Sequence, residues 1–184
     1  MIFLGIDPGL TGALAALDDQ GVVKGVWDTP TLVTRSGVRE RREYDLAQMR
    51  GLLAQWSPWI HEFLVQAGGK NPNPVSCRCA LELVGPMPKQ GVVSMWRMGF
   101  GVGVWEGLLA ALRIPVERVS PQRWKGIMLD GLPKGKDASL YRAKSLWPDQ
   151  VDKLSLKKHE GRAEALLIAE WMRRTWHGRA FSTP

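Results

Sequence analysis

The chain has 184 residues, of which 45% are apolar and 23% are charged, values typical of a folded soluble domain and unlike those of a disordered chain. No apolar run is long enough to span a bilayer, and the N-terminus lacks the basic residues of a secretion signal. The net charge of +7 favours an anionic partner, most often nucleic acid. We expect one domain over residues 1–184.

The first part of the chain predicts three strands in an antiparallel meander. Residues 2–7 form a short apolar run that ends in an acid and Pro-Gly, as a buried strand does. Apolar runs at 11–17 and 22–27 flank Asp-Asp-Gln-Gly, which predicts a hairpin turn. The basic segment that follows is interpreted either as a solvated arm or as an arm that contacts phosphates; it contains Arg35, Arg39, Arg41 and Arg42.

The rest of the chain alternates predicted helices and strands. Helical spacing of apolar residues predicts helices at 45–66, with a kink at Pro58, and at 90–112, 121–128, 137–147 and 159–176. Apolar runs predict strands at 75–84 and 115–119. This order indicates an α/β fold with a mixed five-stranded sheet flanked by helices.

The predicted helix at 90–112 is rich in glycine. Gly99, Gly101, Gly103 and Gly107 do not match the spacing of a G-x-G-x-x-G loop, and no Gly-Lys-Ser/Thr follows them, so we expect no nucleotide cofactor. Because glycine destabilises a helix, we expect close packing against the sheet, another helix or a second subunit.

Cysteine and histidine give no sign of a zinc site. Cys77 and Cys79 are the two cysteines, and their spacing places them on one face of a strand. His61, His159 and His177 are scattered without ligand spacing. Buried free thiols in a reducing compartment are the preferred interpretation, which predicts a cytoplasmic protein.

Four acids lie where they can converge. Asp7 ends the first strand, Glu82 lies in an apolar strand, and Glu160 and Glu164 share a helix face because they are four residues apart. Each alone has an ordinary explanation, such as a turn cap or a favourable position near a helix N-terminus. Together they predict a site for Mg²⁺ or Mn²⁺, since hard cations prefer carboxylate oxygens.

Five motifs, spread in order over nearly the whole chain, resemble the RuvC family of Holliday-junction resolvases and, within it, the phage-type branch. They are GIDPGLTG at 5–12, LE at 81–82, MPKQG at 87–91, VSPQRWK at 119–125 and HEGRAEALLIA at 159–169. The first motif is shared with actin-like kinases, whose fold needs two such domains around a nucleotide. The resemblance implies an RNase H-like fold and a homodimeric nuclease that cuts four-way and branched DNA with two Mg²⁺ or Mn²⁺ ions per site.

The resemblance also implies roles for individual acids. Asp7 would bridge the two ions, while Glu82 and Glu164 would each bind one of them. The fourth ligand departs from the bacterial pattern, because Gly161 stands three residues before the last acid. Glu160 is the preferred ligand, with His159 as a neighbour that handles protons, and the choice between them stays open.

For contacts with DNA, the resemblance points to Lys125 at the scissile or adjacent phosphate. Further candidates for the DNA backbone are Lys89, Arg123, Lys134 and Lys136. Gly85 stands where bacterial members carry a base-stacking aromatic residue, and the candidates to replace it are Pro86, Met87 and Trp96.

The nine tryptophans are mostly interpreted as core or interface residues. Base stacking is an alternative for Trp124 and Trp147, which stand near basic residues. Two other functions stay open beside junction cutting. One is an RNase H-like nuclease with broader branched-DNA or RNA–DNA substrates, and the other is a junction-binding protein without catalysis.

Overall fold

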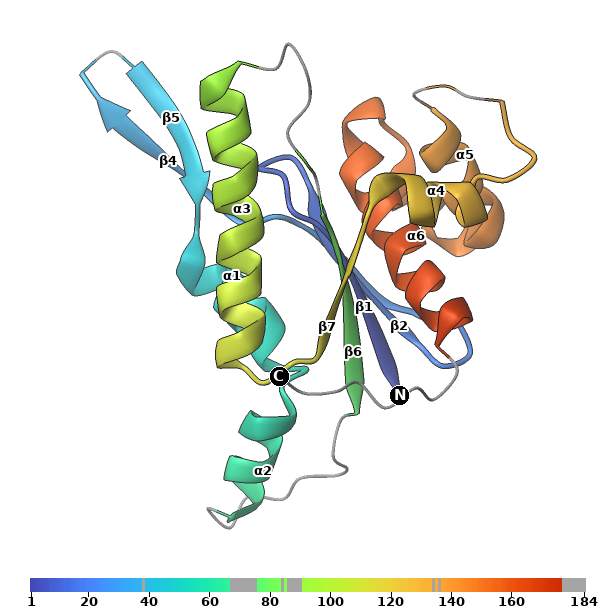
Figure 1. Ribbon diagram of the computed structural model, residues 1–184, viewed down its shortest axis with the longest axis horizontal. Helices are drawn as coiled ribbons and strands as arrows, with labels where there is room; N and C mark the ends of the chain where they lie inside the picture. The colour runs from blue at the N-terminus through green and yellow to red at the C-terminus, as the bar shows by residue number, and fades with distance from the viewer. Residues whose placement is uncertain are drawn as a thin grey trace.

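The computed structural model describes residues 1–37, 39–66, 76–83, 85, 91–133, 135 and 137–176. Its centre is a five-stranded mixed sheet with the order β3-β2-β1-β6-β7 (Figure 1). The first three strands form the predicted antiparallel meander, and β6 and β7 continue the sheet in parallel with β1. The predicted α/β class with a mixed five-stranded sheet is therefore confirmed. The strands are β1 (Ile2–Asp7), β2 (Ala13–Asp18), β3 (Val23–Asp28), β6 (Cys77–Glu82) and β7 (Val116–Val119).

Helices cover both faces of the sheet (Figure 1). On one face lie α1 (Leu46–Ala54) and α3 (Val92–Ala111), with α2 (Pro58–Gln66) continuing from α1. On the other lie α4 (Pro121–Met128), α5 (Ala138–Leu146) and α6 (Glu160–Thr175). Two short 3₁₀ helices, η1 (Pro148–Leu154) and η2 (Lys157–His159), connect α5 to α6. No helix in the described ranges is long and apolar enough to cross a membrane.

The predicted kinked helix over 45–66 is wrong, because the structure has two separate helices there. Pro58 begins α2, a position where proline is favoured since its missing N–H would have no helical partner. The Ser57 hydroxyl accepts the N–H of Ile60 at 3.3 Å and so caps the new helix.

The arginine-rich segment folds as a β-hairpin rather than an irregular arm. Strands β4 (Thr31–Ser36) and β5 (Arg39–Tyr44) form a separate two-stranded sheet beside α3 (Figure 1). The sequence did not predict strands here, because charged residues dominate the segment and no apolar face alternates along it. The Tyr44 hydroxyl donates a hydrogen bond to the Pro8 carbonyl oxygen at 3.0 Å and ties the hairpin to the end of β1.

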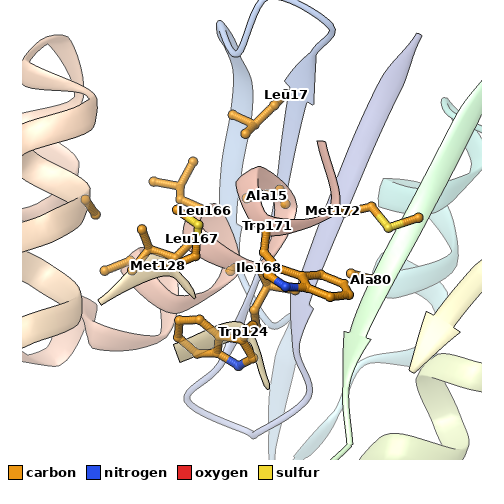
Figure 2. Packing of buried hydrophobic residues seen from close by; sticks show 14 of the residues in the cluster. Ala15, Leu17, Ala80, Trp124, Met128, Leu166, Leu167, Ile168, Trp171 and Met172 are labelled. Atoms are coloured by element: carbon orange, nitrogen blue, oxygen red, sulfur yellow. The ribbon is translucent and has the colours of Figure 1, made fainter. Parts of the chain in front are cut away.

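Successive side chains of each strand point to opposite faces of the sheet, so the strands contribute to two hydrophobic cores, one on each face. Phe3 packs on the α4–α6 side and Leu4 on the α1–α3 side. Figure 2 shows Trp124 and Trp171 within the first core. Trp124 and Trp147 are both buried, so the base-stacking alternative for them is wrong.

Cys77 and Cys79 are both buried in the second core, in agreement with the predicted shared face. Both thiols are free, and burial raises the pKa of Cys77 to about 12. A thiol with so high a pKa is protonated at neutral pH and has little nucleophilic reactivity.

The expected close packing of the α3 glycines holds at one position. A Cβ atom on Gly101 would lie 2.2 Å from the Tyr44 hydroxyl and 2.7 Å from the Pro8 carbonyl oxygen, so glycine is required there. Gly99, Gly103 and Gly107 face open space within the described structure, so their predicted packing on the sheet or on another helix is wrong.

Candidate active site

Asp7 and Glu82 end neighbouring parallel strands. The register of β1 and β6 pairs Ile6 with Leu81, which brings the next residue of each strand to the same edge of the sheet. Glu82 is buried and Asp7 is partly buried. The sheet topology therefore brings together two acids that lie 75 positions apart in the chain.

Helix α6 approaches this edge because two glycines allow it. A Cβ atom on Gly5 would lie 2.2 Å from the Ala165 carbonyl oxygen, so α6 packs directly on the β1 backbone. At Gly161 a Cβ atom would lie 2.5 Å from the Thr11 carbonyl oxygen and 3.1 Å from Asp7 Oδ2. The first turn of α6 thus lies against the Asp7 carboxylate.

Asp7, Glu82 and Glu164 influence one another electrostatically. Burial, and then the charges of Glu164 and Glu82, raise the pKa of Asp7 to about 7, against the opposing effects of the Gly9 N–H and Lys125. Burial also raises the pKa of Glu82, which the Trp124 hydrogen bond opposes and the charge of Glu164 reinforces. A buried carboxyl with so high a pKa beside two other acids is more typical of a functional site than of a structural one.

Two consecutive residues of α4 contact two of these acids. Trp124 Nε1 donates to Glu82 Oε1 at 2.8 Å, and Lys125 Nζ lies 2.7 Å from Glu164 Oε1. Burial acts to lower the pKa of Lys125, but the contact with Glu164 outweighs it and the pKa is raised. The VSPQRWK motif therefore places one donor on each of two site acids.

Ser139, at the start of α5, is a site residue that the sequence did not reveal. Its hydroxyl donates to Glu164 Oε1 at 3.0 Å. Trp124 as the partner of Glu82 was missed as well, although its place next to Lys125 in the motif was a usable signal.

Glu160 and His159 lie in different surroundings. Glu160 is exposed and lines a cleft of about 600 Å³ together with Lys125, Ser139 and Glu164. His159 is buried, and its Nδ1 accepts the Leu156 N–H at 3.3 Å. Burial, with the charges of Arg162 and Lys158, lowers the pKa of His159. Glu160 thus borders the cleft that Glu164 lines, while the charges that act on His159 are those of Arg162, Lys158, Asp28 and Lys144.

The predicted DNA contacts are only partly within the described structure. Arg123 is exposed, lies 3.1 Å from Glu117 Oε1 and places its guanidinium 5.0 Å from the centre of a Trp171 ring. Lys89, Lys134 and Lys136 lie outside the described residues, as do Pro86 and Met87.

In the described part of the chain, no group of three or more acidic, histidine or cysteine side chains is close enough together to hold a metal ion as it stands. The acids nevertheless fit a divalent cation chemically. All their donors are carboxylate oxygens, and a cation would favour the charged form of Asp7, whose pKa is raised by burial and by the charges of Glu164 and Glu82. Lys125 supplies positive charge at Glu164.

Comparison with known proteins supports the family that the motifs indicate. The chain is 34% identical, over 152 residues, to the chloroplastic Holliday junction resolvase MOC1 of Chlamydomonas reinhardtii. The match covers 79% of this chain but 17% of the relative, so the chain spans about a sixth of that protein's length. No protein-family model matches the sequence.

Two solved structures of RuvC from Thermus thermophilus are also similar. The RuvC structure is 18% identical, with a TM-score of 0.44, and the match covers 95% of this chain and 96% of that one. RuvC in complex with a Holliday junction substrate is 16% identical, with a TM-score of 0.46 and 95% of each chain covered. The chain is thus similar, over most of its own length, to one stretch of a Holliday junction resolvase, and it carries the five motifs given above in order.

Proposed function

We propose that this protein is a structure-selective endonuclease that cuts Holliday junctions and other branched DNA by metal-dependent hydrolysis. The observation that carries the proposal is the convergence of Asp7, Glu82 and Glu164 at one edge of the sheet, where burial and the charges of Glu164 and Glu82 raise the pKa of Asp7 to about 7. The relative that is a Holliday junction resolvase supports the same activity.

The residues that would hold the metal are the predicted acids. Asp7 would be shared between two Mg²⁺ or Mn²⁺ ions, with Glu82 on one and Glu164 on the other, and Glu160 would complete the set from the rim of the cleft. When bound, such a pair of ions activates a water for in-line attack and stabilises the leaving oxygen of the phosphodiester. His159 remains the alternative to Glu160.

The chain's own side chains would orient the acids and the DNA. Trp124 fixes the rotamer of Glu82, and Ser139 does the same for Glu164. Lys125 already lies at the site, and it would contact the scissile or adjacent phosphate once cations replace it at Glu164. Backbone contacts by Lys89, Arg123, Lys134 and Lys136 would hold the DNA arms and make binding sensitive to salt.

A homodimer is part of the proposal, because a four-way junction is nearly two-fold symmetric and needs two cuts. The exposed side of α3 is the surface that suits a second subunit. Gly99, Gly103 and Gly107 recur every four residues along it with open space above them, and Val92 at the start of the same helix is 76% exposed. We further propose a cytoplasmic setting and a single domain over residues 1–184, consistent with the free buried cysteines.

The test is a cleavage assay on a synthetic four-way junction with Mg²⁺ and, separately, with EDTA. Plain duplex, Y-shaped DNA and an RNA–DNA hybrid serve as matched substrates. We expect paired, symmetric cuts in the junction that require the metal. Equal cutting of plain duplex would contradict selectivity, preferred cutting of the hybrid would favour the broader RNase H-like activity, and tight junction binding without cutting would favour a non-catalytic role.

A further inference from the structure

Arg162 lies in the first turn of α6, between the two acids of that helix, Glu160 and Glu164. Its guanidinium forms a bidentate ion pair with Asp28 at the end of β3, in which Nε donates to Oδ1 at 2.5 Å and Nη2 donates to Oδ2 at 2.7 Å. The remaining nitrogen, Nη1, donates to the carbonyl oxygen of Lys153 in η1 at 3.1 Å. One side chain thus joins α6 to β3 and to η1, and we call these three contacts the Arg162 clamp.

The clamp lies at the same edge of the sheet as the acids. The strand registers pair Asp7 with Ala13 and Ala13 with Asp28. Two strand spacings, about 10 Å, therefore separate the backbone of Asp28 from that of Asp7. The clamp fastens α6 to the sheet beside the site and not at a remote point.

Arg162 and the two acids of α6 occupy opposite flanks of the helix. Successive residues of an α-helix are rotated by about 100°, so Arg162 lies roughly 200° around the axis from Glu160 and from Glu164. Between the flanks, α6 meets the sheet at Gly161 and at the backbone of Ala165. A contact that holds Arg162 towards β3 therefore restrains the rotation of α6 about its own axis, the movement that would displace both acids from Asp7.

Few other contacts fix the start of α6. Glu164 is held on its own flank by Lys125 and Ser139. Glu160 is exposed, and no hydrogen bond or ion pair joins its carboxylate to another residue in the described ranges. His159, the N-cap residue, forms no side-chain hydrogen bond with the first turn. The position of Glu160 therefore depends on how the helix itself is held.

The clamp orients the helix more than it stabilises the fold. The side chains of Asp28 and Arg162 are 62% and 23% exposed, and ion pairs with such exposure contribute little to overall stability. The hydrogen bonds from Arg162 lower the pKa of Asp28, so its carboxylate is charged at neutral pH and the pair is intact. Two parallel hydrogen bonds also fix the direction of the guanidinium, which a single point contact does not.

We propose that Arg162 is a positioning residue, which sets the rotation of α6 through Asp28 and the Lys153 carbonyl and so places Glu160 and Glu164 for binding Mg²⁺ or Mn²⁺. The inference deepens the proposed function and rests on it, because α6 carries two of the acids of that function. A direct contact of Arg162 with a DNA phosphate is the competing role. It fits less well, because all three guanidinium nitrogens already donate within the protein.

The first experiment measures Mn²⁺ binding by calorimetry, without DNA. Arg162→Gln should weaken binding about 10- to 100-fold, the range for residues that orient metal ligands. The double variant with Asp28→Asn should be no worse than Arg162→Gln, because the two side chains act as a pair. Arg118→Gln is the matched control, since Arg118 forms a bidentate exposed pair with Glu106 that joins β7 to α3. Wild-type affinity in Arg162→Gln would overturn the proposal.

The second experiment needs neither metal nor DNA. Hydrogen exchange of the peptide covering residues 157–166 should be faster in Arg162→Gln and in Asp28→Asn than in wild-type protein, while urea denaturation stays close to wild type. Arg162→Lys should recover part of the protection, because an ammonium group keeps the charge but not the forked geometry. Exchange as slow in Arg162→Gln as in Arg118→Gln, or a loss of global stability that accounts for the weaker Mn²⁺ binding, would contradict a positioning role.

Cleavage and binding of a four-way junction separate the remaining outcomes. We expect Arg162→Gln to need more Mg²⁺ for half-maximal cutting, with junction affinity and its salt dependence unchanged. If the salt dependence instead falls by about one counterion and Asp28→Asn behaves as wild type, Arg162 contacts DNA and the proposal fails. If wild-type protein binds Mn²⁺ but cuts no branched DNA, the proposed cutting is wrong, and the Mn²⁺ affinities and hydrogen exchange still decide the role of the clamp.

Discussion

Helices α6 and α3 cover opposite faces of one sheet, yet they bury very different shares of their residues. Ten of the 16 residues of α6 are buried, against four of the 20 residues of α3. Composition does not explain this, because α3 has the more apolar sequence and leaves Val92, Val93, Trp96 and Phe100 exposed. Helix α3, the less buried of the two, therefore has more side-chain surface accessible to other molecules.

Glycine has opposite consequences on the two faces. On the α6 face, Gly5 and Gly161 allow backbone to touch backbone, and the acid at Glu164 is positioned by that contact. On the α3 face, Gly99, Gly103 and Gly107 touch nothing that the structure describes. Tight packing thus positions the acids, while these glycine positions on the opposite face are left uncovered.

The largest expected effect concerns the acids on the α6 face. Asp7→Asn should lower junction cutting by about 10³-fold, because a catalytic metal contributes several kcal/mol and each 1.36 kcal/mol is about tenfold in rate. Junction binding should be retained, since the variant removes negative charge. Single-turnover cleavage and gel-shift titration measure the two separately. Cutting that persists at the wild-type rate would place the metal elsewhere.

A second test addresses how α6 is held. Gly5→Ala should destabilise the fold by about 3 kcal/mol, because the added methyl group meets backbone atoms of Ala165 and Ala169, which side-chain rotation cannot relieve. Gly51→Ala on α1 is the control, since no atom lies within 4 Å of its Cβ position. Urea denaturation compares the two, and equal stability would show that α6 can shift outward at little cost.

Trp124→Phe should reduce cutting about 10- to 100-fold, the range for loss of a hydrogen bond that orients a metal ligand. The substitution keeps a ring in the core but removes the donor to Glu82 Oε1. Trp147→Phe is the matched control. Trp147 is also buried, but its indole N–H donates to the Gly21 carbonyl oxygen and not to a site acid. Mg²⁺ titrations of the cleavage rate should separate these variants; a common Mg²⁺ dependence would limit Trp124 to a packing role.

The raised pKa of Asp7 predicts how stability depends on pH without metal. Since the folded-state pKa of about 7 exceeds the ordinary value of 3.8, the folded state holds an extra proton between those values. The metal-free protein should therefore lose about 1–3 kcal/mol of stability as pH rises from 4 to 7 through this group. Thermal melts in EDTA at several pH values should show this loss in wild-type protein and not in Asp7→Asn. An identical slope in both proteins would mean that Asp7 ionises normally.

Much of the fold was predictable because its signals are local. The apolar runs that end at Asp7 and Glu82 predict strands, and apolar spacing predicts α6. The hairpin over residues 31–44 was not predictable in the same way. It buries no apolar face of its own, and its position depends on a long-range hydrogen bond from Tyr44 to Pro8.

The sequence indicated the acids of the site, but not every side chain that forms a hydrogen bond with them. Motif resemblance indicated Asp7, Glu82 and Glu164. The parallel strands β1 and β6 bring the first two acids to one edge, and α6, packed closely on Gly5, brings the third. Ser139 is separated from Glu164 by 25 positions, and no local pattern marks its hydroxyl as a donor to that acid. The choice of Glu160 over His159 stays a prediction, since exposure on the cleft supports it without testing it.

The smallest expected effect tests the open face of α3. Gly103→Ala should raise the stability of the isolated subunit by roughly 0.5–1 kcal/mol, because alanine favours a helix and its Cβ position is free. If the glycine row packs on a second subunit, the same methyl group should weaken the dimer, since it prevents close approach of the two helices. Denaturation at low protein concentration and sedimentation over a concentration series measure these opposite effects. A variant that is more stable and dimerises as before would exclude this row from the interface.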